Sequence, residues 1–183
     1  LEQQFPEIAE LLLEHHPDIN AANADTWTPL MIAVNNGMTE MVQKLLTLGA
    51  DVNAVTEDGE TALMTASYNG EMPDIIKLLL TAHADVNKAN NQGETALLKA
   101  VDYGDAEPVK LLLDAGADVN AANEEGDTAL MIACSNGATA IVKLLLHAGA
   151  DVNIKNKQSE VAIIKAIDYY GDANMVKVLL AAK

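Results

Sequence analysis

A tripeptide that recurs at an almost constant interval constrains this chain more than any other feature. Asp-Ile-Asn begins at Asp18, and Asp-Val-Asn begins at Asp51, Asp85, Asp118 and Asp151, with intervals of 33, 34, 33 and 33 residues. A second series, Thr-Pro-Leu or Thr-Ala-Leu, begins at Thr28, Thr61, Thr95 and Thr128 and becomes Val-Ala-Ile at Val161. A fixed period of this length indicates stacked structural repeats rather than one enclosed core.

The sequence of every unit predicts the same order of secondary-structure elements. A threonine can cap the start of a short apolar helix. A glycine ends that helix at Gly37, Gly70, Gly104, Gly137 and Gly171. A second apolar helix follows, and then an extended finger around Asp-Val-Asn. The second unit has an extra residue after Gly70, and the fifth has an extra residue before Gly171, which we assign to Tyr170.

These units resemble the ankyrin repeat, whose pattern runs D-G-x-T-P-L-H-x-A-A-x-x-G, then a second helix, then G-A-D-V-N. The resemblance covers nearly the whole chain and implies a single domain with an all-α solenoid fold and a concave face of inner helices and fingers. The expected divisions are an N-terminal half repeat, 1–22, and units 23–55, 56–89, 90–122, 123–155 and 156–183. The Met-rich style resembles bacterial members of the family.

One position departs from the family pattern throughout. The histidine after Thr-Pro-Leu is replaced by Met31, Met64, Leu98, Met131 and Ile164. Packing must therefore take over the hydrogen bonding that the histidine would provide.

The charge of the chain excludes several classes of partner. The net charge is −16, and all eleven basic residues are lysines. Nucleic acids and anionic membranes attract cationic surfaces, so neither is expected to bind. A protein partner with a basic patch fits better. A single cysteine favours the cytoplasm, while the absence of Met at Leu1 keeps a removed signal peptide, and so a periplasmic or secreted location, open.

No catalytic or cofactor site is expected. His16 and His83 stand where other units have the glycine that ends the second helix, so they are expected to end helices rather than bind a metal. Cys134 replaces an alanine of the inner helix and should be a small buried residue. Paired carboxylates such as Glu57 and Asp58 are too abundant here to indicate an acid–base pair. The chain is therefore predicted not to be an enzyme and to need no cofactor.

The candidate binding residues gather on the concave face that the resemblance implies. Aromatic residues make up only 3% of the chain, yet four of the six fall on this face: Trp27, Tyr68, Tyr103 and Tyr169. The carboxylates expected there are Asp25, Glu57, Asp58, Glu60, Glu94, Asp102, Glu124, Glu125, Asp127, Glu160 and Asp168. Lys99 and Lys165 each precede an aspartate by three and a tyrosine by four, which predicts ion pairs with Asp102 and Asp168.

These features predict a non-catalytic, monomeric module that binds a protein through an acidic, tyrosine- and tryptophan-bearing face. Two alternatives stay open. The chain could be an interaction domain of a larger protein whose catalytic domain lies elsewhere, or a stabilising protein without a defined partner on this face.

Overall fold

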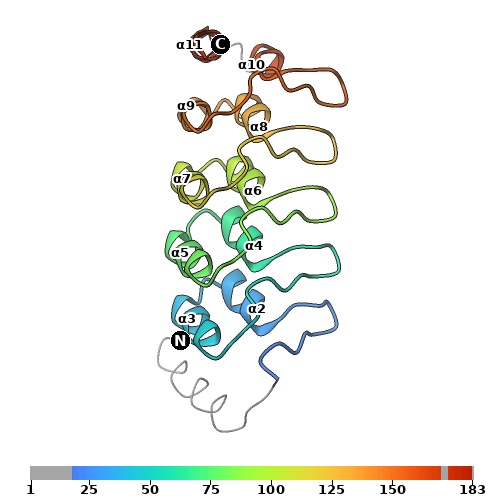
Figure 1. Cartoon of the computed structure of the whole chain (residues 1–183), viewed down its shortest axis with the longest axis vertical. Coiled ribbons are helices and arrows are strands. Elements are labelled where there is room, and N and C mark those ends of the chain that lie inside the picture. Colours follow the sequence, from blue (N-terminus) through green and yellow to red (C-terminus); the bar gives the residue numbers. More distant parts are fainter. Residues whose placement is uncertain (1–17, 170–172, 183) are drawn as a thin grey trace.

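The computed structural model describes residues 18–169 and 173–182, and these form ten helices in five stacked pairs (Figure 1). The inner helices, which adjoin the fingers, are α2 (Pro29–Asn35), α4 (Ala62–Tyr68), α6 (Ala96–Tyr103), α8 (Ala129–Ser135) and α10 (Ala162–Tyr169). The outer helices are α3 (Thr39–Thr47), α5 (Pro73–Thr81), α7 (Ala106–Asp114), α9 (Thr139–His147) and α11 (Ala173–Ala181). The all-α solenoid is confirmed. The N-terminal helix expected before residue 18, together with His16 and Tyr170, lies outside the described residues.

Inner helices begin where a threonine accepts a backbone hydrogen bond. The Oγ1 atoms of Thr28, Thr61, Thr95 and Thr128 accept from the N–H three residues further on, at 3.3, 3.2, 3.4 and 3.4 Å. Each cap satisfies an N–H that has no partner within its helix. Val161 has no hydroxyl, and there the N–H of Ile164 donates to the Val161 carbonyl at 2.9 Å. The predicted capping role of the threonines is confirmed.

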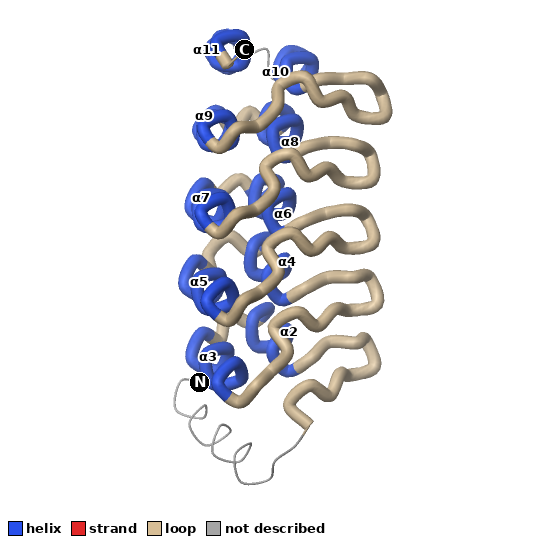
Figure 2. The backbone as a smooth tube through the Cα atoms, in the orientation of Figure 1, coloured by secondary structure: helices blue, strands red, loops and turns tan. Residues whose placement is uncertain are grey.

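The fingers are the loops 18–28, 48–61, 82–95, 115–128 and 148–161, which project to one side of the stack (Figure 2). Each is closed by a backbone hydrogen bond across its tip, such as that from the N–H of Asn90 to the carbonyl of Glu94 at 3.0 Å. Neighbouring tips are also joined, because the N–H of Asn91 donates to the carbonyl of Asp58 at 2.9 Å. The finger tips are therefore held in register along the stack.

The recurrent asparagine explains why Asp-Val-Asn repeats. The side-chain oxygens of Asn20, Asn53, Asn87 and Asn120 accept from the N–H of the aspartate that opens the next tripeptide, at 2.8, 2.7, 2.7 and 2.8 Å. Each bond satisfies a loop N–H and joins two neighbouring units. The tripeptide is thus a joint between repeats, and its period follows from the stacking.

The core runs through the whole stack between the two layers of helices. Leu45, Leu79, Leu112 and Leu145 occupy the same position in four outer helices and are at most 1% exposed. The residues that replace the family's histidine are also buried at Met31, Met64, Leu98 and Met131, whereas Ile164 is 37% exposed. Packing does take the place of the histidine at the first four positions.

His83 ends α5 in the left-handed conformation, with φ +64°, where the other described units have glycine. The equivalent Gly116 and Gly149 have φ +88° and +90°. The predicted helix-ending role of His83 is confirmed. Because His83 has a Cβ, the left-handed conformation is strained at this position, whereas at the glycines it is not.

Replacing His83 with glycine is therefore expected to leave stability unchanged or raise it by up to ~1 kcal/mol, because the left-handed conformation is then unstrained. Thermal and urea unfolding of the two proteins check this. The reverse change, Gly116→His, is the control and should destabilise by about 1 kcal/mol. A clear fall in melting temperature for His83→Gly would show that the histidine side chain itself is needed.

Candidate functional site

Two tyrosines are the most exposed rings on the inner helices that the structure describes. Tyr68 ends α4 and is 52% exposed, and Tyr103 ends α6 and is 47% exposed. Their ring centroids lie 6.5 Å apart with the planes at 68°, an edge-to-face arrangement. A Cβ at Gly70 would overlap the ring of Tyr103. The Tyr103 ring therefore covers the turn of the preceding helix pair. Position 70 must be glycine, because any side chain there would occupy the space of this ring.

Lys99 lies near the ring of Tyr68 and is held by carboxylates from two fingers. Its Nζ lies 2.6 Å from Glu94 Oε2, 3.0 Å from Glu60 Oε1 and 5.9 Å from the centroid of the Tyr68 ring. Asn90 Nδ2 donates to the same two carboxylates, at 2.6 Å to Glu60 and 3.1 Å to Glu94. We call Glu60, Asn90, Glu94 and Lys99 the first polar cluster.

The predicted ion pair between Lys99 and Asp102 is wrong. An i, i+3 pair would keep both side chains at the surface of α6. Instead, Lys99 bends toward the fingers. Two carboxylates and a tyrosine ring stabilise its charge there more than a single exposed aspartate would, and its side chain is only 19% exposed. Asp102 stays exposed.

The same constellation recurs two units later. Lys165 Nζ lies 2.7 Å from Glu160 Oε2 and 3.7 Å from Asp127 Oδ1. Asn156 Nδ2 donates to Asp127 at 2.7 Å and to Glu160 at 2.9 Å. This second polar cluster matches the first position for position. Asn90 and Asn156 were missed by the sequence interpretation, although an asparagine followed four residues later by glutamate, with lysine five beyond, is a signal in both units.

Pairing changes the proton affinities of the first cluster. Burial on its own would raise the pKa of Glu94, but hydrogen bonds from Lys99 and Asn90 and the charge of Lys99 outweigh it, so the pKa lies below its ordinary value. Burial would likewise lower the pKa of Lys99, yet Glu94 and Glu60 raise it overall. In the second cluster, hydrogen bonds from Lys165 and Asn156 lower the pKa of Glu160. The shifts favour the charged forms of Glu94, Lys99 and Glu160.

The remaining predicted site residues divide into three groups. Seven carboxylates are exposed on the finger tips and helix ends: Asp25, Glu57, Asp58, Asp102, Glu124, Glu125 and Asp168. Trp27 is half-buried and packs against the core, so its ring is less open than the two tyrosine rings. The side chain of Tyr169 lies outside the described part of the structure.

Within the described residues, no group of three or more histidine, cysteine, aspartate or glutamate side chains could hold a metal ion. Cys134 is fully buried, and burial raises the pKa of its thiol to about 12, which keeps it a protonated packing residue, as predicted. No helix in the described ranges is long and apolar enough to cross a membrane.

The stack of helix pairs with joined fingers defines a helical-repeat solenoid. The family profile for "Ankyrin repeats (3 copies)" matches residues 1–90, 33–123, 66–156 and 109–183, which together span the chain. This protein belongs to the ankyrin-repeat family, whose members generally serve as protein–protein interaction modules.

Curated relatives match parts of the chain. The B-cell lymphoma 3 protein homolog of Mus musculus is 45% identical over 64 residues, which are 34% of this chain and 14% of that protein. Protein phosphatase 1 regulatory subunit 27 of Mus musculus is 37% identical over 54 residues, 30% of this chain and 35% of that protein. A Caenorhabditis elegans homolog of transient receptor potential cation channel subfamily A member 1 is 42% identical over 53 residues, 29% of this chain and 4% of that protein. The matched stretch thus covers at most 35% of any of these three relatives.

Proposed function

We propose that this chain is a non-catalytic module that binds a protein partner through its inner face, meaning the exposed side of the inner helices and the finger tips. The observation that carries this proposal is the exposed pair Tyr68 and Tyr103, held edge to face between neighbouring units. Tyrosine offers a large contact area with few rotatable bonds, and binding hot spots are rich in it. Because Tyr103 packs over Gly70 and Lys99 Nζ lies 5.9 Å from the centroid of the Tyr68 ring, both rings are positioned before a partner binds, and the partner has little ordering left to impose.

The charge on the inner face favours a basic partner. Its seven exposed carboxylates are spread along the stack, from the first finger to α10. Lys99 and Lys165 do not offset them, because each lies between two carboxylates of its own cluster. Complementary charge speeds association, and salt at physiological strength screens it over about 8 Å. Binding should therefore weaken as salt is added.

Within this proposal the predicted contact residues take two roles. Tyr68, Tyr103, Tyr169, Trp27 and the exposed carboxylates contact the partner directly. Glu60, Glu94, Lys99 and Asp127 already bond to one another within the clusters and support the surface. Substituting a supporting residue should therefore alter stability more than it alters affinity.

Replacing Tyr68, Tyr103 and Tyr169 together with alanine is expected to weaken binding of a captured partner at least ~10-fold, since hot-spot tyrosines contribute about 2 kcal/mol or more. Affinity capture with the wild-type chain, followed by titration of each recovered partner, measures this. The matched control replaces the same three residues with phenylalanine, which keeps the rings and should keep affinity within a few-fold. Partners held equally by wild type and triple alanine would contradict the site and leave a stabilising role without a partner on this face.

The alternative of an interaction domain within a larger protein has its own support. The three relatives described above extend well beyond the part that this chain matches. In that case the inner face would bring a partner to a domain elsewhere in the same protein. The length of the complete coding sequence decides between the two.

A further inference from the structure

The turn between α4 and α5, residues 69–72, is one residue longer than the turns after α2 and α8, residues 36–38 and 136–138. In the turn after α2, the N–H of Met38 donates to the carbonyl of Ala33 at 2.9 Å, and in the turn after α8 the N–H of Ala138 donates to the carbonyl of Ala133 at the same distance. After α4 the extra residue is Glu71, whose N–H donates to the carbonyl of Asn69 at 2.6 Å. The longer turn is thus closed in a different way.

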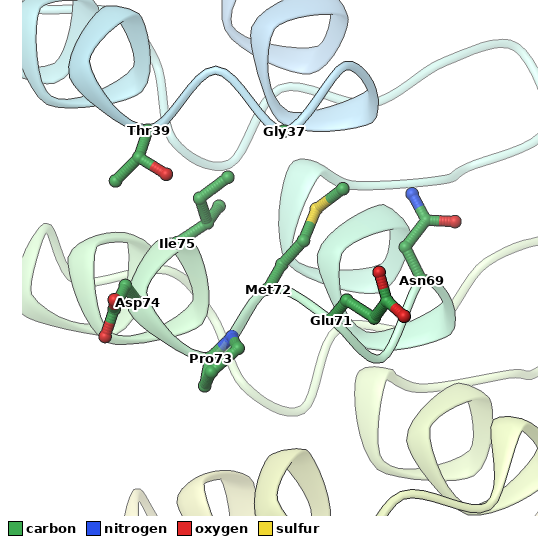
Figure 3. A pocket seen from close by; sticks show the side chains of 8 residues that line it. All are labelled: Gly37, Thr39, Asn69, Glu71, Met72, Pro73, Asp74 and Ile75. Carbon is green, nitrogen blue, oxygen red and sulfur yellow. The ribbon is translucent and has the colours of Figure 1, made fainter.

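Beside this turn lies a hollow of about 370 Å³. Gly37 and Thr39 line it from the first helix pair, and Asn69, Glu71, Met72 and Ile75 line it from the second. Figure 3 shows Met72 and Ile75 pointing toward the segment that carries Gly37 and Thr39, with Glu71 and Asn69 on the side away from Thr39. A Cβ at Gly37 would lie 3.5 Å from Met72 Cε, so the methionine reaches across the gap. The hollow has an apolar middle and polar groups on both sides.

The charges around the hollow select a cation. Glu71 is exposed, and among the described residues no lysine forms an ion pair with it. The other lining carboxylate, Asp74, is bound by Lys77 at 3.3 Å and points away from Thr39 in Figure 3. No lysine lines the hollow, so an anion would find no counter-charge. One free carboxylate beside two apolar side chains suits a group with an apolar stem and a cationic head.

We propose that this hollow receives one lysine or arginine side chain of the bound partner. The methylene stem packs on Met72 and Ile75, the cationic head lies at Glu71, and Asn69 on the same side of the hollow offers a further oxygen acceptor. The volume is near the lower end of the ~300–1,000 Å³ range of ligand pockets, which suits a single side chain. This inference rests on the proposed protein-binding function and adds an anchor to it.

The hollow lies at the turn that follows Tyr68, and neither tyrosine ring lines it. Asn69 follows Tyr68 directly, and Gly70, between Asn69 and Glu71, lies under the ring of Tyr103. A segment of the partner that crosses the two rings can therefore place a side chain in the hollow. The anchor also depends on the insertion of Glu71 and not on the repeat pattern, since no equivalent residue stands in the turns after α2, α6 and α8.

Titration of the isotopically labelled chain with Nα-acetyl-arginine amide and Nα-acetyl-lysine amide, followed by NMR, tests the anchor. We expect saturable shifts of the backbone signals of Gly37, Asn69, Glu71 and Ile75. The neutral probe Nα-acetyl-glutamine amide should produce none that saturate. Glu71→Gln should weaken binding of the cationic probes ~2- to 5-fold, as expected for one partly exposed charge pair. The matched control Asp114→Asn removes an equal charge from the exposed end of α7 and should leave binding of the probes unchanged.

The anchor would be overturned by no shift at these residues, by equal shifts with the neutral probe, or by unchanged binding in Glu71→Gln. Shifts spread over carboxylates around the whole surface would also overturn it, because they indicate unspecific attraction. The Tyr68→Ala/Tyr103→Ala variant separates this result from the proposed function. It should bind the probes normally while losing affinity for a captured partner. If the probes fail but the tyrosine variant still loses its partner, only the anchor is wrong.

Discussion

Replacement of Leu112 with alanine is expected to lower the free energy of unfolding by about 2–5 kcal/mol, the range found for large-to-small changes in well-packed cores. Leu112 is completely buried in α7, which contacts α5 and α9 on either side and α6 across the pair. In a stack each pair is stabilised only by its neighbours, so a cavity in the middle weakens two interfaces together.

Urea unfolding followed by circular dichroism measures the change, with the slope of the transition checked for a loss of cooperativity. The matched control is Leu180→Ala, the same chemical change at a side chain in α11 that is 49% exposed. It should cost less than about 1 kcal/mol. Equal effects at the two positions would mean that Leu112 does not lie in a packed interface.

The second large effect is expected at Lys99. Changing it to methionine keeps most of the volume but leaves Glu60 and Glu94 facing each other without a cation. Their side chains are 25% and 33% exposed, so water screens part of the repulsion and the expected loss is about 1–2 kcal/mol, below that for a fully buried pair. Lys110→Met, on the exposed side of α7, is the control and should be nearly neutral.

The contribution of the first polar cluster should depend on pH with a definite sign. The pKa of Glu94 is lowered from its ordinary value of 4.5, so its stabilisation is present above 4.5 and is lost as pH falls through the lower folded value. The pKa of Lys99 is raised from 10.5, so its stabilisation is present below 10.5 and is lost as pH rises through the higher folded value. The stability difference between wild type and Lys99→Met should be largest between these limits and should shrink in acid. A difference that stays constant from neutral pH to well below 4.5 would refute the pairing.

The double variant Glu94→Gln/Lys99→Met tests whether the two groups act together. Removal of both charges should cost less than the sum of the single changes, because the main penalty of either change is the partner left unpaired. Because the second cluster lies two units away, a change at Lys165 should add to a change at Lys99 independently.

Local signals in the sequence predicted the helices and their ends well. Thr61 and Thr95 cap helices because a hydroxyl two atoms from the backbone reaches the N–H of the third residue on, which depends only on nearby residues. His83 adopts φ +64° because the residue at that point must turn the chain out of the helix. The extra residue after Gly70 was also found by counting, although counting could not show the hollow beside it.

The candidate site was predicted in outline only. Tyr68 and Tyr103 are exposed as expected, but their contact depends on Gly70 of the intervening turn, which sequence spacing does not show. Lys99 was paired with Asp102 because helical spacing is the only distance that a sequence reports directly. Its partners come from two fingers, 39 residues before it in the case of Glu60 and 5 before it in the case of Glu94.

The sequence by itself determined the fold of this protein, because a period of 33 residues repeats the same caps, apolar positions and loop asparagines, and stacking is the arrangement in which every copy is satisfied. Only the tertiary structure decided which charges are free for a partner. Neighbouring units bring Glu60, Glu94 and Lys99 within bonding distance of one another. Because Lys99 is paired with two carboxylates, its charge is not available to a partner. Glu71 keeps its carboxylate open because the insertion places it beside a hollow with no lysine in the lining. Which groups remain available depends on contacts between units, and those contacts form only when the chain stacks.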